Sequence, residues 1–131
     1  MPEIRMKRWN DPIEPERDGT RILICRYRPR GLPKSDETWS EWHPNLGPSK
    51  ELHAAAYGKN RSGPLDWASY RATYLREMRE QTDAIAALAA RVAKGETITL
   101  MCASSCERDA RCHRSLLREL ILKMLDRNAT E

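Results

Sequence analysis

Residues 97–102, TITLMC, decide the fold, because this stretch has the β-branched and apolar content of a central β-strand. A second short apolar run, RILIC at residues 21–25, predicts another buried strand. Helical patterns lie between the two runs, and strands joined through helices most easily become parallel neighbours in one sheet. We therefore expect an α/β fold, a small single-domain sheet with parallel central strands flanked by helices, over residues 1–131.

The N-terminal segment predicts one more strand. Residues 4–9, IRMKRW, alternate apolar and charged side chains, which is the period of a half-exposed edge strand. The alternation ends at Asn10-Asp11-Pro12, where a turn is favoured.

Helical segments complete the prediction. Ser49 is placed to cap a short helix over residues 50–56, and Asp66 is placed to cap a longer one. Apolar positions then recur at helical spacing to Val92, which indicates one long helix or two collinear helices with a break at Thr82-Asp83. A last amphipathic helix begins close to Cys112 or His113.

Composition limits the classes of function. The 131 residues carry a net charge of +4, which attracts phosphate-bearing molecules but falls short of a dedicated DNA-binding stripe. No run approaches the ~20 apolar residues of a membrane span, and the N-terminus does not resemble a signal peptide. We expect a cytoplasmic protein without membrane contact, in which Cys25, Cys102, Cys106 and Cys112 stay as thiols.

Two loops are expected to meet at one edge of the sheet. The first follows residues 21–25 and carries Arg26, Arg28 and Arg30, and the second follows Cys102. Ligand sites in open α/β sheets lie outside the carboxyl ends of the strands. The arginine loop and the cysteine loop therefore converge where a site is expected.

Several motifs, in order along the chain, resemble the YeaO-like branch of the domain-of-unknown-function 488 family, and together they cover nearly the whole chain. They are Lys7-Arg8, Asp11-Pro12, Asp18-Gly19, residues 21–24 with Arg26, Pro29-Arg30-Gly31, Trp42, residues 46–52, Trp67, Tyr70, Cys102 and Cys112-His113-Arg114. The resemblance implies an α/β fold and no settled activity. Two features depart from the pattern. Cys25 stands where the family usually has an acidic residue, and YeaO-like members often lack the Cys-His-Arg triplet.

The triplet Cys112-His113-Arg114 at the start of the last helix is the strongest candidate site. Unpaired backbone amides and the helix dipole favour an anion there, Arg114 adds hydrogen-bond donors, and the same field lowers the pKa of a thiol. We assign Cys112 and His113 as catalytic candidates, and Arg26, Arg30, Cys102 and Arg114 as ligand-binding candidates. The structural alternative is a packed Cys112, a His113 bonded to a backbone carbonyl and an Arg114 paired with an acid.

Two other readings of the cysteines are weaker. Cys102 to Arg108 matches the spacing of a cysteine-phosphatase loop, but the acidic Glu107 and Asp109 repel phosphate. Cys102, Cys106, Cys112 and His113 count as four zinc ligands, yet the adjacent Cys112 and His113 do not easily turn onto one ion. We expect no metal and no cofactor. Trp39, Trp42, Trp67 and Tyr70 are expected to pack the long helix against the sheet.

These observations favour an enzyme or sensor that binds a phosphate-bearing small molecule or nucleotide in a cationic pocket. The alternative is a non-catalytic module that binds nucleic acid or a protein through its basic surface. Reaction, substrate and oligomeric state are left open by the sequence.

Overall fold

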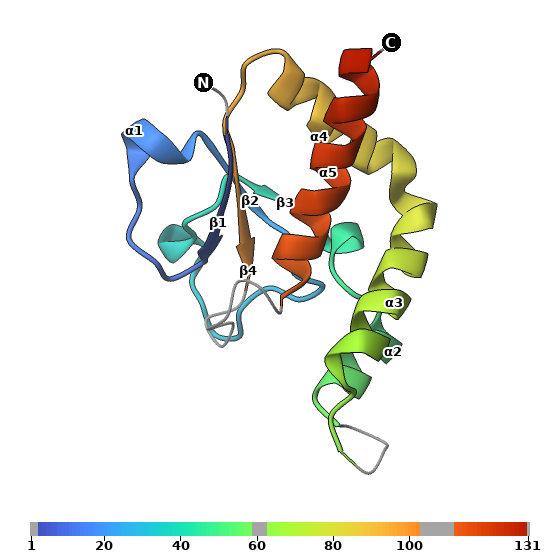
Figure 1. Ribbon diagram of the computed structural model, residues 1–131. Coiled ribbons are helices and arrows are strands. Elements are labelled where there is room, and N and C mark those ends of the chain that lie inside the picture. The colour runs from blue at the N-terminus through green and yellow to red at the C-terminus, as the bar shows by residue number, and fades with distance from the viewer. Residues whose placement is uncertain (1–2, 59–62, 103–111, 131) are drawn as a thin grey trace.

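A parallel sheet lies at the centre of the protein, within the residues that the computed structural model describes, 3–58, 63–102 and 112–130 (Figure 1). It has four strands in the order β1-β4-β2-β3. Their bounds are Ile4–Arg8 for β1, Thr20–Leu23 for β2, Glu41–Trp42 for β3 and Ile98–Cys102 for β4. Strand β4 is parallel to both β1 and β2, so the predicted parallel central strands are confirmed.

The helices follow the predicted pattern closely. They are α2, Lys50–Ala56; α3, Trp67–Met78; α4, Thr82–Ala93; and α5, His113–Thr130. Ser49 and Asp66 accept hydrogen bonds from the amides of Leu52 and Ser69, so both predicted N-caps are confirmed. The predicted break is also present, because the 3₁₀ turn η3, Arg79–Gln81, separates α3 from α4.

One face of the sheet carries the main hydrophobic core. Helices α3, α4 and α5 lie on this side of the strands (Figure 1). Alternate strand residues point into it. The core residues are Ile4, Ile22, Ile98 and Leu100 from the strands, Ile24 and Leu46 from the segments after β2 and in the 3₁₀ turn η2 (Pro44–Leu46), and Leu52, Tyr74, Met78, Ile85, Leu88, Ala89, Val92, Leu116, Leu117 and Ile121 from the helices. The period-two alternation of the strands therefore sends these side chains to the helical layer.

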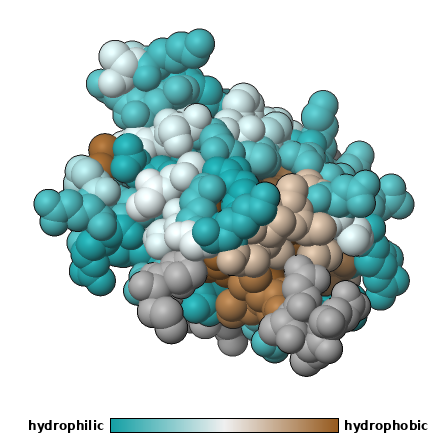
Figure 2. Space-filling model, turned by 90° about the horizontal axis from the view of Figure 1, so that it is seen from above, coloured by the Kyte–Doolittle hydropathy of each residue, from teal (hydrophilic) through white to brown (hydrophobic). Residues whose placement is uncertain are grey.

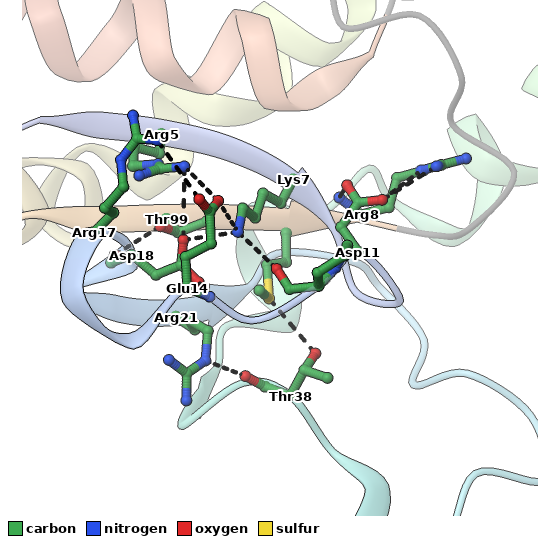
Figure 3. A network of polar contacts seen from close by, with 12 residues as sticks. Arg5, Lys7, Arg8, Asp11, Glu14, Arg17, Asp18, Arg21, Thr38 and Thr99 are labelled. Atoms are coloured by element: carbon green, nitrogen blue, oxygen red, sulfur yellow. Dashed lines mark hydrogen bonds and ion pairs between the residues drawn. The ribbon is translucent and has the colours of Figure 1, made fainter.

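The other face is covered by irregular chain and by the short helix α1, Pro15–Asp18. Leu23 and Met101 form a small apolar cluster with Trp39 there. Beside it, the strand side chains are polar. Lys7 and Arg5 of β1 and Thr99 of β4 meet Glu14 and Asp18 of the covering segment (Figure 3).

Three kinds of element were not predicted. They are helix α1, strand β3 and the 3₁₀ turns. The 3₁₀ turns are η1, Lys34–Asp36; η2, Pro44–Leu46; and η3. Each spans only two to four residues, too few for a hydrophobic period to be recognised. As for a membrane span, no helix among the described residues is long and apolar enough to form one.

Candidate functional site

The carboxyl ends of three strands meet the start of α5 at one edge of the sheet. The amide of Trp9, just after β1, donates to the carbonyl of Cys102 at 2.9 Å, and the amide of Ile24, just after β2, donates to Met101 at 3.0 Å. Helix α5 begins at His113, so its first amides face this edge. The structure thus places Cys102, Cys112, His113 and Arg114 in one region.

Two thiols form the centre of this region. Cys102 and Cys112 are both buried and both reduced. The Sγ atom of Cys112 lies 3.6 Å from Sγ of Cys102 and 3.8 Å from Nδ1 of His113. The end of β4 and the start of α5 are therefore in contact through two free thiols that lie ten residues apart in sequence.

His113 is held in one orientation by the sheet. Its Nε2 lies 2.8 Å from the carbonyl oxygen of Ile24, and its ring packs 5.7 Å from the ring of Tyr74. A carbonyl oxygen only accepts, so Nε2 carries the hydrogen and, in the neutral ring, Nδ1 has the free lone pair. That lone pair faces the thiol of Cys112. The pair has the arrangement of a nucleophile and a base whose tautomer is set by a third group.

Tyr74 secures the ring from the helical side. Its hydroxyl donates to the carbonyl of Leu46 at 2.7 Å, and burial is the main reason that its pKa lies well above the usual value. The phenol is therefore a neutral structural group that packs against His113.

Arg114 is almost completely buried, with 1% of its surface exposed. It lies near Asp11, just after β1. Burial alone would raise the pKa of Asp11, but hydrogen bonds from Arg8 and the charges of Arg8 and Arg114 outweigh it, and the pKa is lowered. Arg8 donates to this carboxylate through its backbone amide at 2.8 Å and through its guanidinium at 3.1 Å (Figure 3). Two guanidinium groups therefore share the edge with one carboxylate.

The three arginines of the loop after β2 have different surroundings. Arg26 is half-buried and donates from Nε to the carbonyl of Pro48 at 2.9 Å. Arg28 instead pairs with Glu37 and lies 5.9 Å from the ring centre of Trp39. Arg30 is exposed and has no hydrogen bond or ion pair with any residue in the described ranges. Arg26 is thus the residue of this loop that lies along the edge of the sheet.

A glycine permits the position of Arg26. A Cβ atom added to Gly47 would lie 2.4 Å from the amide nitrogen of Arg26, closer than any side chain tolerates. The backbone of the η2 turn can therefore approach the end of β2 only because residue 47 is glycine. The approach places Arg26 beside the N-terminus of α2.

The packing of the tryptophans is partly corrected. Trp67 and Tyr70 pack against the main core, as predicted. Trp39 does not, because it belongs to the cluster on the opposite face of the sheet, and Trp42 is 42% exposed with its indole nitrogen bonded to the carbonyl of Cys25. Trp42 belongs to the short strand β3 and Trp39 precedes it, and the sequence did not reveal this strand, so their sheet face was not predictable.

The phosphatase and zinc readings rest on Cys106, Glu107, Arg108 and Asp109, which lie outside the described residues. Among the residues that are described, no group of three or more histidine, cysteine or acidic side chains is arranged to hold a metal ion. Sequence analysis did not identify Asp11, Tyr74 or the carbonyl of Ile24 as parts of the site. Asp11-Pro12 was noted in the resemblance, and this was the one available signal.

A separate hollow lies at the opposite end of the sheet. It has a volume of about 390 Å³, and its lining residues are Glu3, Ile4, Val92, Arg118, Leu122 and Leu125. Figure 2 shows apolar surface at this end of the molecule. Arg118 donates there to the carbonyl of Ile4 at 2.9 Å.

Comparison with known proteins gives a consistent result. A sequence model described as the active DUF488-N3 subclade matches residues 4–125. The uncharacterized protein YeaO of Escherichia coli is 38% identical over 98 residues, which are 75% of this chain and 80% of that protein. The uncharacterized proteins Mb3100c of Mycobacterium bovis and Rv3073c of Mycobacterium tuberculosis are each 39% identical over 49 residues, 37% of this chain and 41% of theirs. No solved structure shows a significant match.

Proposed function

The chain belongs to the YeaO-like branch of the domain-of-unknown-function 488 family. From the residues at the carboxyl edge of its sheet, we propose that it binds a phosphate-bearing ligand there. Relatives in this family are named as uncharacterized proteins, so the argument rests on the site. The ligand class is a phosphorylated small molecule or a nucleotide.

One observation carries this proposal. Three arginines lie in the chain at this edge: Arg8 at the end of β1, Arg26 in the loop after β2 and Arg114 in the first turn of α5. Guanidinium groups and the amides at a helix N-terminus are the donors that phosphate oxygens prefer. Asp11 neutralises part of this charge, and a dianionic phosphate would neutralise more.

The Cys112 and His113 pair supplies a reactive group beside this charge. When the thiol passes its proton to Nδ1, the imidazolium carries a proton on each nitrogen, and Nε2 still donates to Ile24. The start of α5 stabilises the thiolate. Cys112 is then the nucleophile, His113 is the base, and Cys102 is the neighbouring thiol that holds Cys112 in place.

The second candidate is a non-catalytic module that binds nucleic acid or a protein. The exposed Arg30 favours it, because this side chain is directed to solvent in a loop at the same edge. Such a module binds through a broad basic face, and its affinity falls steeply with salt concentration. A small-molecule pocket has a much weaker salt dependence, so one titration at two salt concentrations separates the candidates.

The proposal is tested by thermal-shift titration with inorganic phosphate and a set of phosphorylated metabolites in reducing buffer. Arg26→Met keeps the apolar stem and removes one charge-assisted contact of ~1.5–3 kcal/mol, so affinity should fall about ten- to a hundredfold. Arg17→Met is the control, because Arg17 is 68% exposed on α1 and loses the same charge. Equal affinity of Arg26→Met and the wild type, or no phosphate compound that raises the midpoint, would contradict the proposal.

Arg114→Met needs a second measurement. Because Arg114 is buried, its replacement is expected to lower the free energy of unfolding as well as the affinity. Affinity is therefore measured by calorimetry at a temperature where the variant is folded. A folded variant that binds phosphate as tightly as the wild type would remove Arg114 from the site.

A further inference from the structure

Exposed aromatic side chains gather around residues 25–27. Five large apolar side chains of the described residues are exposed, and three of them, Tyr27, Trp42 and Tyr57, are aromatic. Trp42 donates from its indole nitrogen to the carbonyl of Cys25 at 2.8 Å. The ring of Tyr27 lies 5.2 Å from that of His53, which lies 4.9 Å from that of Tyr57. The rings of Tyr27, His53 and Tyr57 are therefore continuous, and Trp42 is bonded to the backbone two residues before Tyr27.

These rings are not used for packing the core. Tyr27 is 48% and Tyr57 is 56% exposed, and neither belongs to the two hydrophobic clusters. Single exposed apolar side chains are ordinary, whereas a contiguous group of them at one place indicates a binding surface. Trp42 is held by its hydrogen bond and Tyr27 by an edge-on contact with His53, so a ligand that stacks on them orders little further.

Positive charge lies within the same surface. Arg26 stands in the chain between Cys25 and Tyr27, and its Nε is bonded to Pro48. Lys50 is exposed on α2, three residues before His53 and therefore on the same side of that helix. Flat aromatic rings beside guanidinium and ammonium groups match a base attached to a phosphate. They do not match a phosphate on an aliphatic chain, which offers no π face.

We propose that Tyr27, Trp42, His53 and Tyr57 form a base-stacking surface, and that the ligand of the neighbouring cationic edge is a nucleotide unit, free or at the end of a single strand. This inference rests on the proposed function for the phosphate, whereas the base is recognised by the aromatic side chains alone. Stacking is largely indifferent to which base is bound, so the surface selects a base-bearing ligand rather than one sequence.

The test compares 5′-AMP, ribose 5-phosphate and adenosine by calorimetry on the whole chain. AMP should bind roughly 5- to 100-fold tighter than ribose 5-phosphate, because stacking of one base supplies the difference. Tyr27→Leu should remove most of this advantage and leave the affinity for ribose 5-phosphate unchanged. Tyr27→Phe keeps the ring and should keep the advantage, and Ile13→Ala, which changes an exposed apolar residue outside the group, should have no effect.

The outcomes separate this inference from the proposed function. If AMP and ribose 5-phosphate bind equally, the phosphate site stands and the stacking surface is refuted. If adenosine binds in a Tyr27-dependent manner and ribose 5-phosphate does not bind, the stacking surface stands and the phosphate site is refuted. If none of the three binds, both are refuted. Loss of the AMP advantage in Ile13→Ala, or its survival in Tyr27→Leu, also overturns the stacking assignment.

A further measurement shows whether the base belongs to a free mononucleotide or to a single strand. A short single-stranded oligonucleotide should bind at least tenfold tighter than AMP if two or more of the rings stack successive bases. Affinities that are equal within a factor of about three assign the surface to a free mononucleotide. Both results require the same Tyr27 dependence, and an oligonucleotide affinity that is unchanged in Tyr27→Leu refutes the surface.

Discussion

The two faces of the same sheet are stabilised by different physical means. Toward the helices, strand residues such as Ile22 and Leu100 are fully buried among apolar side chains. Toward α1, Asp18 is equally buried, yet it is a carboxylate, and its Oδ1 lies 2.9 Å from Nζ of Lys7. Strand β4 contributes to both faces of the sheet, because Leu100 faces the helices while Thr99 donates to the backbone carbonyl of Asp18 on the other side.

The difference shows how a small protein covers a sheet with too few apolar residues for two layers. The helical face gains from removing hydrocarbon from water, which requires no particular geometry. The polar face requires that each buried charge meet its partner, since a buried ion left alone is costly. Burial alone would raise the pKa of Asp18, but the Glu14 amide and the charge of Lys7 outweigh it, and the pKa is lowered. The carboxylate therefore stays ionised where it is buried.

The largest effect is expected on the apolar face. Leu100→Ala removes a fully buried side chain from the central strand and leaves a cavity, so the free energy of unfolding should fall by about 2–5 kcal/mol. Chemical denaturation measures this loss. The neighbouring Thr99→Val, which nearly preserves volume and removes one hydrogen bond on the other face, should cost only about 1 kcal/mol. Equal losses for the two variants would contradict the comparison.

A somewhat smaller effect is expected on the polar face. Asp18→Asn removes the charge opposite Lys7 and leaves Glu14 as its remaining partner, so the loss should be about 2–3 kcal/mol at neutral pH. Adding Lys7→Met should recover part of it, which a double-mutant cycle measures. If the double variant is no more stable than Asp18→Asn, the loss does not come from leaving Lys7 without its partner Asp18, and the expectation is contradicted.

The same variant predicts a pH dependence. The pKa of Asp18 in the folded protein is lowered from its usual 3.8, so its contribution is present above that value and is lost as pH falls through the folded pKa. The stability difference between the wild type and Asp18→Asn should therefore shrink in acid, whereas that of Leu100→Ala should not. A constant difference from neutral to acid pH would mean that Asp18 is not charged in its buried position.

The smallest effect concerns an ion pair between β3 and α4. Glu41 accepts two hydrogen bonds from Arg91, at 2.7 and 2.9 Å, and this contact is the main reason that its pKa falls from 4.5 to about 2. Both side chains are about one third exposed, so solvent screens the pair and Glu41→Gln should cost only about 1 kcal/mol or less. The contribution is present above pH 4.5 and is lost toward pH 2. A loss as large as that of Asp18→Asn would erase the distinction between exposed and buried charge.

Much of the fold was predictable from local patterns. The strands, the caps at Ser49 and Asp66, the break near Thr82 and the start of the last helix depend on residues close together in sequence. One rule about the carboxyl ends of parallel strands led us to expect the arginine loop and the cysteine loop at the same edge. The structure places Cys112 beside Cys102 there. These features follow from hydrophobic period, capping and topology, which a sequence displays directly.

The sequence by itself therefore determined strands β1, β2 and β4 and helices α2 to α5, and it predicted a candidate site at the carboxyl edge of the sheet. Only the tertiary structure decided what each polar side chain meets. Thr99 binds Asp18 across 81 positions of sequence, His113 binds the carbonyl of Ile24 across 89, and Trp39 packs on the face away from the long helices. Such contacts join residues far apart in sequence and depend on which face a covering loop takes, and the side-chain period of a single segment does not specify its distant partner.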